Sequence, residues 1–165
     1  MNKSQSGFTL VELVVVILIL GILSATALPR FMNVNQQANE AAVAGAGGGF
    51  SAGAALVRAQ WIANNTAAAD TAVANFGASN VAVNVSGWPT STTAATTLAN
   101  ATHCVEIWNG IMQNPPLAAI AAGANIDYVA AFAGTSCTYT YQPAGAMSIQ
   151  YDSNTGTIAV DDAFL

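Results

Sequence analysis

The chain has 165 residues, of which 53% are hydrophobic and only 7% are charged, and its formal net charge is −5 at pH 7. This length leaves room for one domain and an N-terminal segment. The acidic balance, with only 3 Lys and Arg residues, argues against a nucleic-acid partner, because that affinity depends largely on basic side chains that neutralise phosphates. A surface made largely of small neutral residues instead suits packing against other copies of the chain.

An apolar segment near the N-terminus dominates the sequence. It runs from Phe8 to Leu28 with one ionisable side chain, Glu12, and as a helix it would be roughly 32 Å long, about one hydrocarbon thickness. Lys3 in the short polar leader, residues 1–7, favours a cytoplasmic N-terminus. A carboxylate in hydrocarbon costs roughly 2.5–3.5 kcal/mol at mid-span and less near the interface, so Glu12 requires a specific reason.

The junction before this segment reads Gly7-Phe8-Thr9-Leu10-Val11-Glu12. It resembles the processing motif of type IV prepilins and of their relatives, the type II secretion pseudopilins. The resemblance implies that a membrane peptidase cleaves between Gly7 and Phe8 and that the new amine of Phe8 is methylated. Because a lone carboxylate in an apolar run needs a positive partner, we expect Glu12 to pair with that amine during assembly; the other interpretation is that Glu12 snorkels to the cytoplasmic interface and plays no part in assembly. Two other interpretations are an ordinary secretory signal cleaved after Ala27, in an Ala-Thr-Ala triplet, and a plain single-pass anchor.

The helical pattern continues beyond Pro29, which removes one backbone donor and is expected to kink the helix without ending it. A buried stripe is predicted from residues at helical spacing, namely Val43, Ala46, Phe50, Ala54, Val57 and Trp61. We therefore expect one helix over residues 8–61, about 80 Å long, whose part 8–28 needs lipid or other helices around it. The resemblance to pilins implies that this part spans the inner membrane first and forms the filament core later.

A glycine-rich stretch, residues 44–53, interrupts this pattern with Gly45 and Gly47–Gly49. Each glycine costs about 1 kcal/mol relative to Ala in a helix, so one interpretation is a loop that divides the helix. The interpretation that we favour is a continuous, locally loosened helix, in which small residues allow close approach between subunits.

The remaining residues, 62–165, are predicted to form a globular head. Residues 62–100 have low complexity, with a short strand expected at 80–85 and a turn at 87–89. Residues 102–114 have the apolar spacing of an amphipathic helix that Pro115-Pro116 ends. Segments of period two follow at 128–132, 137–141, 147–151 and 157–160, with a turn at 154–156. This order predicts an α+β pilin fold, a long N-terminal helix packed on a small C-terminal antiparallel sheet.

The chain has two cysteines, Cys104 and Cys137, in the part expected outside the cytoplasm. An even pair in an oxidising compartment predicts a disulfide, worth roughly 3–4 kcal/mol in the chain-entropy model. Within the pilin family, the segment at 104–116 and the loop from Cys104 to Cys137 are most similar to major pilins of the mannose-sensitive haemagglutinin type.

No pattern predicts an enzyme, a cofactor or a metal site. His103, next to Cys104, would point away from it on a helix and is interpreted as a solvated cap residue. Residues 152–156 resemble the start of a calcium loop but lack its later ligands, so a hairpin turn is favoured. Trp88, Tyr139 and Tyr141 are candidates for a glycan-binding surface.

The resemblance therefore predicts a structural subunit of a type IV pilus, inserted in the inner membrane as a precursor and assembled into an extracellular helical filament for attachment. Its expected partners are copies of itself, the prepilin peptidase, the assembly machinery and a surface or glycan receptor. The alternatives are a minor pilin or a pseudopilin of type II secretion.

Overall fold

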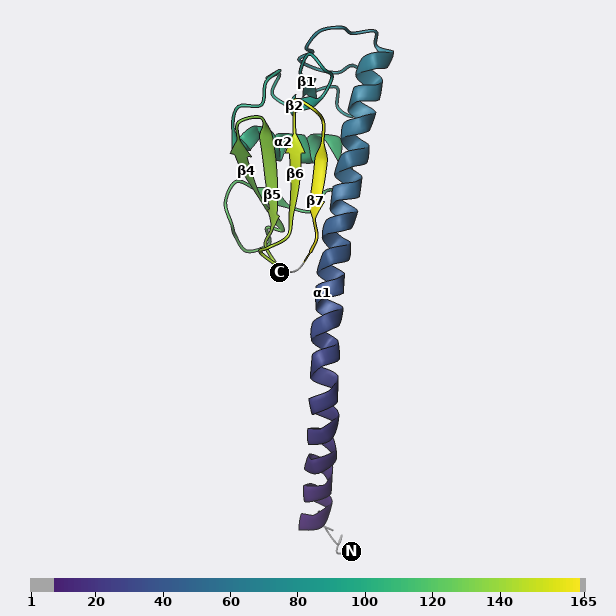
Figure 1. Ribbon diagram of the computed structural model, residues 1–165, viewed down its shortest axis with the longest axis vertical. Coiled ribbons are helices and arrows are strands. Elements are labelled where there is room, and N and C mark those ends of the chain that lie inside the picture. Colours follow the sequence, from purple (N-terminus) through teal and green to yellow (C-terminus); the bar gives the residue numbers. More distant parts are fainter. Residues whose placement is uncertain (1–7, 164–165) are drawn as a thin grey trace, which may run out of the picture. The chain divides into compact units, whose positions relative to one another are not determined.

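The computed structural model describes residues 8–163, and its chain divides into two compact units, residues 1–38 and 39–165. One long helix, α1, contributes residues to both units (Figure 1). The elements, in chain order, are α1 (Leu10–Ala63), β1 (Ala82–Val83), β2 (Pro89–Ser91), α2 (Ala101–Ile111), β3 (Ala118–Ala119), β4 (Tyr128–Ala133), β5 (Ser136–Tyr141), β6 (Ser148–Asp152) and β7 (Ile158–Asp161).

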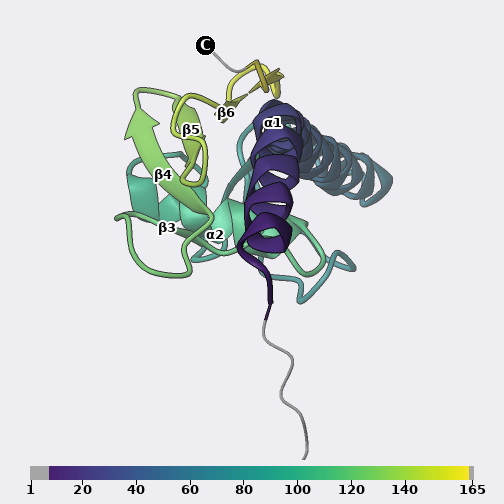
Figure 2. The same cartoon turned by 90° about the horizontal axis from the view of Figure 1, so that it is seen from below.

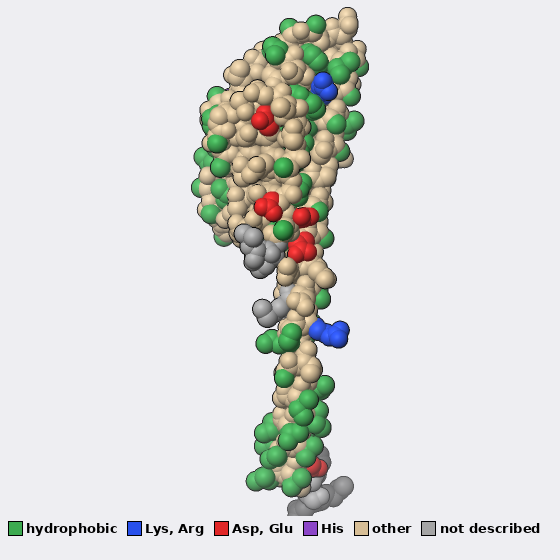
Figure 3. Space-filling view, viewed as in Figure 1, with side chains coloured by type: hydrophobic (Ala, Val, Ile, Leu, Met, Phe, Trp, Pro, Cys, Tyr) green, Lys and Arg blue, Asp and Glu red, His purple; other side chains and the backbone are tan. Residues whose placement is uncertain are grey.

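The first unit consists, in its described part, of the N-terminal half of α1. Its large apolar side chains are exposed all round the helix, from Leu10 at 77% to Leu28 at 68%. Figure 3 shows hydrophobic side chains covering this part of α1, with few charged groups among them. Of the helices within residues 8–163, α1 alone is long and apolar enough to cross a membrane. A helix that is apolar on every side requires lipid or other helices around it.

The second half of α1 confirms that the glycine-rich stretch is helical, since α1 continues without a break to Ala63. Two glycines are explained by packing within the second unit. A Cβ atom on Gly47 would overlap Val160 of β7, and one on Gly53 would overlap the carbonyl oxygen of Ile111 at the end of α2. The close contact with the head therefore requires glycine at these positions, despite its poor helix propensity.

The predicted stripe of α1 is the side that packs against the head. Val43, Phe50, Ala54 and Val57 are fully buried, and Trp61 is 9% exposed. Phe50 lies at the centre of an aromatic cluster, with ring centroids 5.4–5.5 Å from those of Trp108, Tyr139 and Tyr151. Truncation of an aromatic side chain in such a core typically costs 3–5 kcal/mol, roughly, so this cluster is a main source of the stability of the unit.

The main sheet has the order β3-β4-β5-β6-β7. Figure 1 shows its strands β4 to β7. Strands β4 to β7 pair antiparallel, as the alternating segments predicted, and the turn at 154–156 connects β6 to β7. The predicted antiparallel arrangement does not extend to β3, which pairs parallel with β4 through Ala118 and Ala119. Alternate residues, such as Cys137 and Tyr139 of β5, are buried on the face that packs against the helices. Figure 2 shows α2 beside this sheet from below.

A second sheet of two strands lies in the region of low complexity. Strand β1 lies within the predicted 80–85, but β2, which begins at the last residue of the predicted turn at 87–89, was not predicted. The intervening turn is stabilised by Asn84, whose Oδ1 accepts hydrogen bonds from the backbone N–H groups of Ser86 (2.9 Å) and Trp88 (3.1 Å). An Asx turn, a local structure that Asn favours, therefore connects β1 to β2.

Candidate processing and assembly site

Thr9 forms the N-cap of α1. Its hydroxyl accepts a hydrogen bond from the backbone N–H of Glu12 (3.3 Å), and a Glu12 carboxylate oxygen accepts from both the backbone N–H (2.8 Å) and the hydroxyl (2.8 Å) of Thr9. This reciprocal arrangement is a capping box, which satisfies backbone donors that have no partner inside the helix. The helix therefore begins at Leu10, and Phe8 precedes it with 88% of its surface exposed.

Sequence reasoning identified Glu12 but missed Thr9. The signal was present, because a Thr followed three residues later by Glu before an apolar run is the pattern of a capping box. Glu12 thus has a structural role at the start of α1, where a carboxylate also interacts favourably with the positive end of the helix dipole. This role does not conflict with an assembly role, because the same carboxylate could cap the helix of its own chain and meet a group of another.

Gly7 lies outside the described residues, so cleavage at Gly7 and methylation of Phe8 stay predictions. Pro29 lies within α1, which continues on both sides of it. Nearby, the Thr26 hydroxyl donates to the carbonyl of Leu23 (3.0 Å). The missing N–H of Pro29 leaves a carbonyl one turn earlier without its helical partner. The kink predicted at Pro29 stays an expectation.

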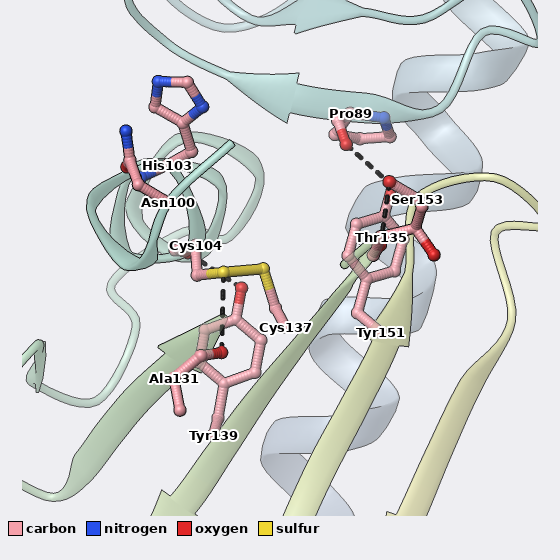
Figure 4. Close-up of a disulfide and its surroundings, with 10 residues drawn as sticks. All are labelled: Pro89, Asn100, His103, Cys104, Ala131, Thr135, Cys137, Tyr139, Tyr151 and Ser153. Atoms are coloured by element: carbon pink, nitrogen blue, oxygen red, sulfur yellow. Dashed lines mark hydrogen bonds between the residues drawn. A yellow bond between two sulfur atoms is a disulfide. The ribbon is translucent and has the colours of Figure 1, made fainter. Parts of the chain in front are cut away.

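The predicted disulfide joins Cys104 in the first turn of α2 to Cys137 in β5, with a Cα–Cα distance of 5.6 Å (Figure 4). Both residues are fully buried, and no free cysteine is present among the described residues. The hydroxyl of Tyr139 donates to the carbonyl of Cys104 (2.8 Å), so β5 holds the start of α2 at two points. The bond closes a long loop of the head, which restricts the unfolded chain.

His103 differs from the predicted solvated cap residue. Its backbone N–H does take part in the cap of α2, donating to Oδ1 of Asn100 (2.9 Å). Its side chain, however, is half-buried, and Nδ1 is buried without a hydrogen-bond partner in the part of the chain that the structure describes.

The three aromatic residues suggested for a glycan surface do not form one. Tyr139 is fully buried in the aromatic core. Trp88 packs against Gly156 and under the guanidinium of Arg58, whose Cζ atom is 4.7 Å from the ring centroid. Tyr141 packs on Tyr128, with ring centroids 5.2 Å apart. Within residues 8–163, no group of three or more His, Cys, Asp or Glu side chains is placed to hold a metal ion.

Buried tyrosines in the head give a testable pH dependence. Burial raises the pKa of Tyr139 well above its ordinary value, and the neighbouring Tyr151 raises it further. Burial likewise raises the pKa of Tyr151. Because the folded state holds these protons more tightly than the unfolded state, their contribution to stability is complete below about pH 10 and is lost as the pH rises above it.

We therefore expect the free energy of unfolding to be nearly constant between about pH 8 and 9.5 and to fall steeply above about pH 10. Denaturant unfolding at a series of pH values, with tyrosinate absorbance as a second signal, measures this. Tyr139→Phe should flatten the alkaline decline. Ionisation of all four tyrosines at their ordinary pKa without loss of structure would contradict the expectation.

Comparison with known proteins identifies the N-terminal segment. Residues 2–28 match the prokaryotic N-terminal methylation motif. The chain is 60% identical over 37 residues to the type IV narrow pilus major component PilA5 of Thermus thermophilus, covering 22% of this chain and 32% of that protein. It is 44% identical over 71 residues to a fimbrial protein of Neisseria meningitidis serogroup A, covering 41% of this chain and 42% of that protein.

These matches confirm the resemblance to type IV pilins that the junction at Gly7 and Phe8 predicted. The chain spans less than half the length of the curated relatives that it matches. No solved structure matches the chain. The narrower similarity to the mannose-sensitive haemagglutinin type stays a prediction.

Proposed function

We propose that this chain is the precursor of a structural subunit of a type IV pilus. The observation that carries the proposal is that the methylation motif, residues 2–28, coincides with a helix whose apolar side chains are uncovered and which begins at a capping box directly after Phe8. In this proposal the precursor is anchored in the inner membrane by the apolar helix. The mature subunit then exchanges lipid for other subunits in an extracellular filament.

The printed names of the relatives, a type IV pilus major component and a fimbrial protein, favour a pilus subunit over a type II secretion pseudopilin. A structural role also fits the aromatic and tyrosine-rich interior of the head, where the largest side chains form a packed core. The proposed partners are further copies of the chain, a prepilin peptidase and the pilus assembly machinery. The filament would serve attachment to surfaces or cells.

The proposed processing has a direct chemical test. Mass spectrometry of the native mature protein is expected to find an N-terminus at N-methylated Phe8. Gly7→Val should leave the uncleaved precursor in the membrane fraction, because it replaces the small glycine of the proposed cleavage site with a branched side chain. Gly21→Val, a change of the same size within the apolar helix, is the control and should still be cleaved. A mature N-terminus at Leu28 would instead establish an ordinary secretory signal.

A further inference from the structure

A shallow groove of about 410 Å³ lies within the second unit, between the outer side of α1 and the chain that leaves α2. Residues of α1 form one wall, and residues 111–116 form the other. The lining residues are Gly45, Ala46, Gly49, Ala52, Gly53, Leu56, Ile111, Met112, Gln113, Asn114, Pro115 and Pro116. The groove is therefore mainly apolar, and none of these residues carries a charge.

Two of the glycines that line the groove, Gly45 and Gly49, are not required by contacts with the head. A Cβ on Gly45 would meet nothing within 4 Å, and one on Gly49 would meet only Met112 Sδ, at 3.9 Å. In contrast, Gly47 and Gly53 are required by contacts with the head. Glycine at 45 and 49 lowers helix stability without any return inside the subunit. At these two positions, one helical turn apart, the helix backbone is exposed, so another helix could approach it closely.

The chain itself contains a segment that fits this groove. Residues 13–28 are helical, carry no charge and expose their large apolar side chains, including Ile17, Leu20 and Leu28. Gly21 and Ala25, also four residues apart, give this helix a narrow side, and a Cβ on Gly21 would meet nothing within 4 Å. Once the helix leaves the lipid, these side chains need an apolar, uncharged cover, and the groove has that character.

We propose that the groove between α1 and the end of α2 receives the apolar helix, residues 13–28, of a second copy of this chain. The contact would be a close helix crossing, with Gly45 and Gly49 of one copy against the side of Gly21 and Ala25 of the other. Leu56, 62% exposed at the edge of the groove, would pack against the apolar side chains of the incoming helix. This inference rests on the proposed pilus function and assigns a specific contact within the filament.

Leucine substitutions at the three open glycines test the proposal. Gly45→Leu and Gly49→Leu place a side chain in the groove, whereas Gly48→Leu is the matched control, because Gly48 is exposed, does not line the groove and has open space around its Cβ position. All three changes favour helix in the same way. We expect the first two to reduce the number of filaments per cell about tenfold or more, since overfilling a close contact disrupts it, and the control to assemble as wild type.

The thermal unfolding of the head and the amount of cleaved protein should be equal to or above wild type in all three variants, which excludes misfolding as the cause. Equal filament numbers for Gly48→Leu, Gly49→Leu and wild type would overturn the contact while leaving the pilus function intact. If the wild-type chain forms no filaments in a cell with a working assembly system, both the proposed function and this inference are contradicted.

A photo-crosslinking residue in place of Leu56 identifies the occupant in assembled filaments. Crosslinks to a peptide within residues 13–28 of another copy are expected, and dimers should appear on denaturing gels. Crosslinks only to a head segment of another copy, to lipid or to a different protein would overturn the assignment.

Discussion

Glu12→Leu is expected to be inserted and cleaved at least as well as the wild type, and yet to give few or misregistered filaments. Leucine removes the insertion penalty of a carboxylate, roughly 2.5–3.5 kcal/mol at mid-span and less near the interface. It also removes the negative charge that a neighbouring subunit could use. In the proposed processing, cleavage after Gly7 would create an amine on Phe8 that stays cationic after methylation. A subunit that enters beneath the filament could present this amine to the Glu12 of a subunit already in place.

The low dielectric of the surroundings strengthens such a pair, which would also set the axial register between subunits. The capping box at Thr9 offers a competing explanation, in which Glu12 matters only because it starts the helix. Phe8 precedes α1, whereas Glu12 lies in its first turn, so the structure leaves both the capping role and the pairing role possible for Glu12. Two further substitutions distinguish the effect of losing the helix cap from the effect of losing the negative charge of Glu12.

Glu12→Gln keeps an oxygen acceptor for the Thr9 backbone N–H but has no charge, since Gln also serves in a capping box. Thr9→Val removes the hydroxyl and keeps the charge. If pairing with the amine drives assembly, Glu12→Gln should resemble Glu12→Leu, and Thr9→Val should retain filaments. Electron microscopy of whole cells and immunoblots of the cleaved subunit give the two readouts. Normal piliation by Glu12→Leu would refute the assembly role.

Removal of the disulfide is expected to lower the free energy of unfolding of the head by about 3–4 kcal/mol, since Cys104 and Cys137 are separated by 33 residues and their bond restricts the unfolded chain. Small domains have only roughly 5–15 kcal/mol of stability in total, so this loss is large. The replacements Cys104→Ala and Cys137→Ala should be combined, because serine would place hydroxyls at two fully buried positions. Denaturant unfolding measures the difference.

Chemical reduction of the wild-type protein is the matched control, because it opens the same loop with almost no change in volume. The reduced protein and the double alanine variant should agree to within about 1 kcal/mol if loop closure is the main contribution. Equal stability of the oxidised and reduced wild type would contradict this account. Free thiols in purified filaments would contradict the disulfide itself.

Much of the fold could be predicted from the sequence because its signals are local and periodic. The apolar run from Phe8 to Leu28 has the length of a membrane-spanning helix, and the stripe that contains Phe50 repeats at helical spacing. The stripe and the run from Leu10 onward lie on α1. The alternation around Tyr139 and Tyr151 predicted strands that the sheet contains. The processing motif is also local, since its residues are consecutive and its capping box closes within one helical turn.

The tertiary structure decided the features that depend on residues far apart in the chain. Strand β3 pairs parallel with β4, and β2 pairs with β1, through segments too short to show a period. The glycines of α1 look alike in the sequence, yet Gly47 and Gly53 touch the head while Gly45 and Gly49 leave a groove open. Helix propensity assigns the same free-energy cost to every glycine, because it takes no account of tertiary contacts. Only the packing of Val160 and Ile111 against α1 distinguishes the glycines required inside the subunit from those whose Cβ position is open.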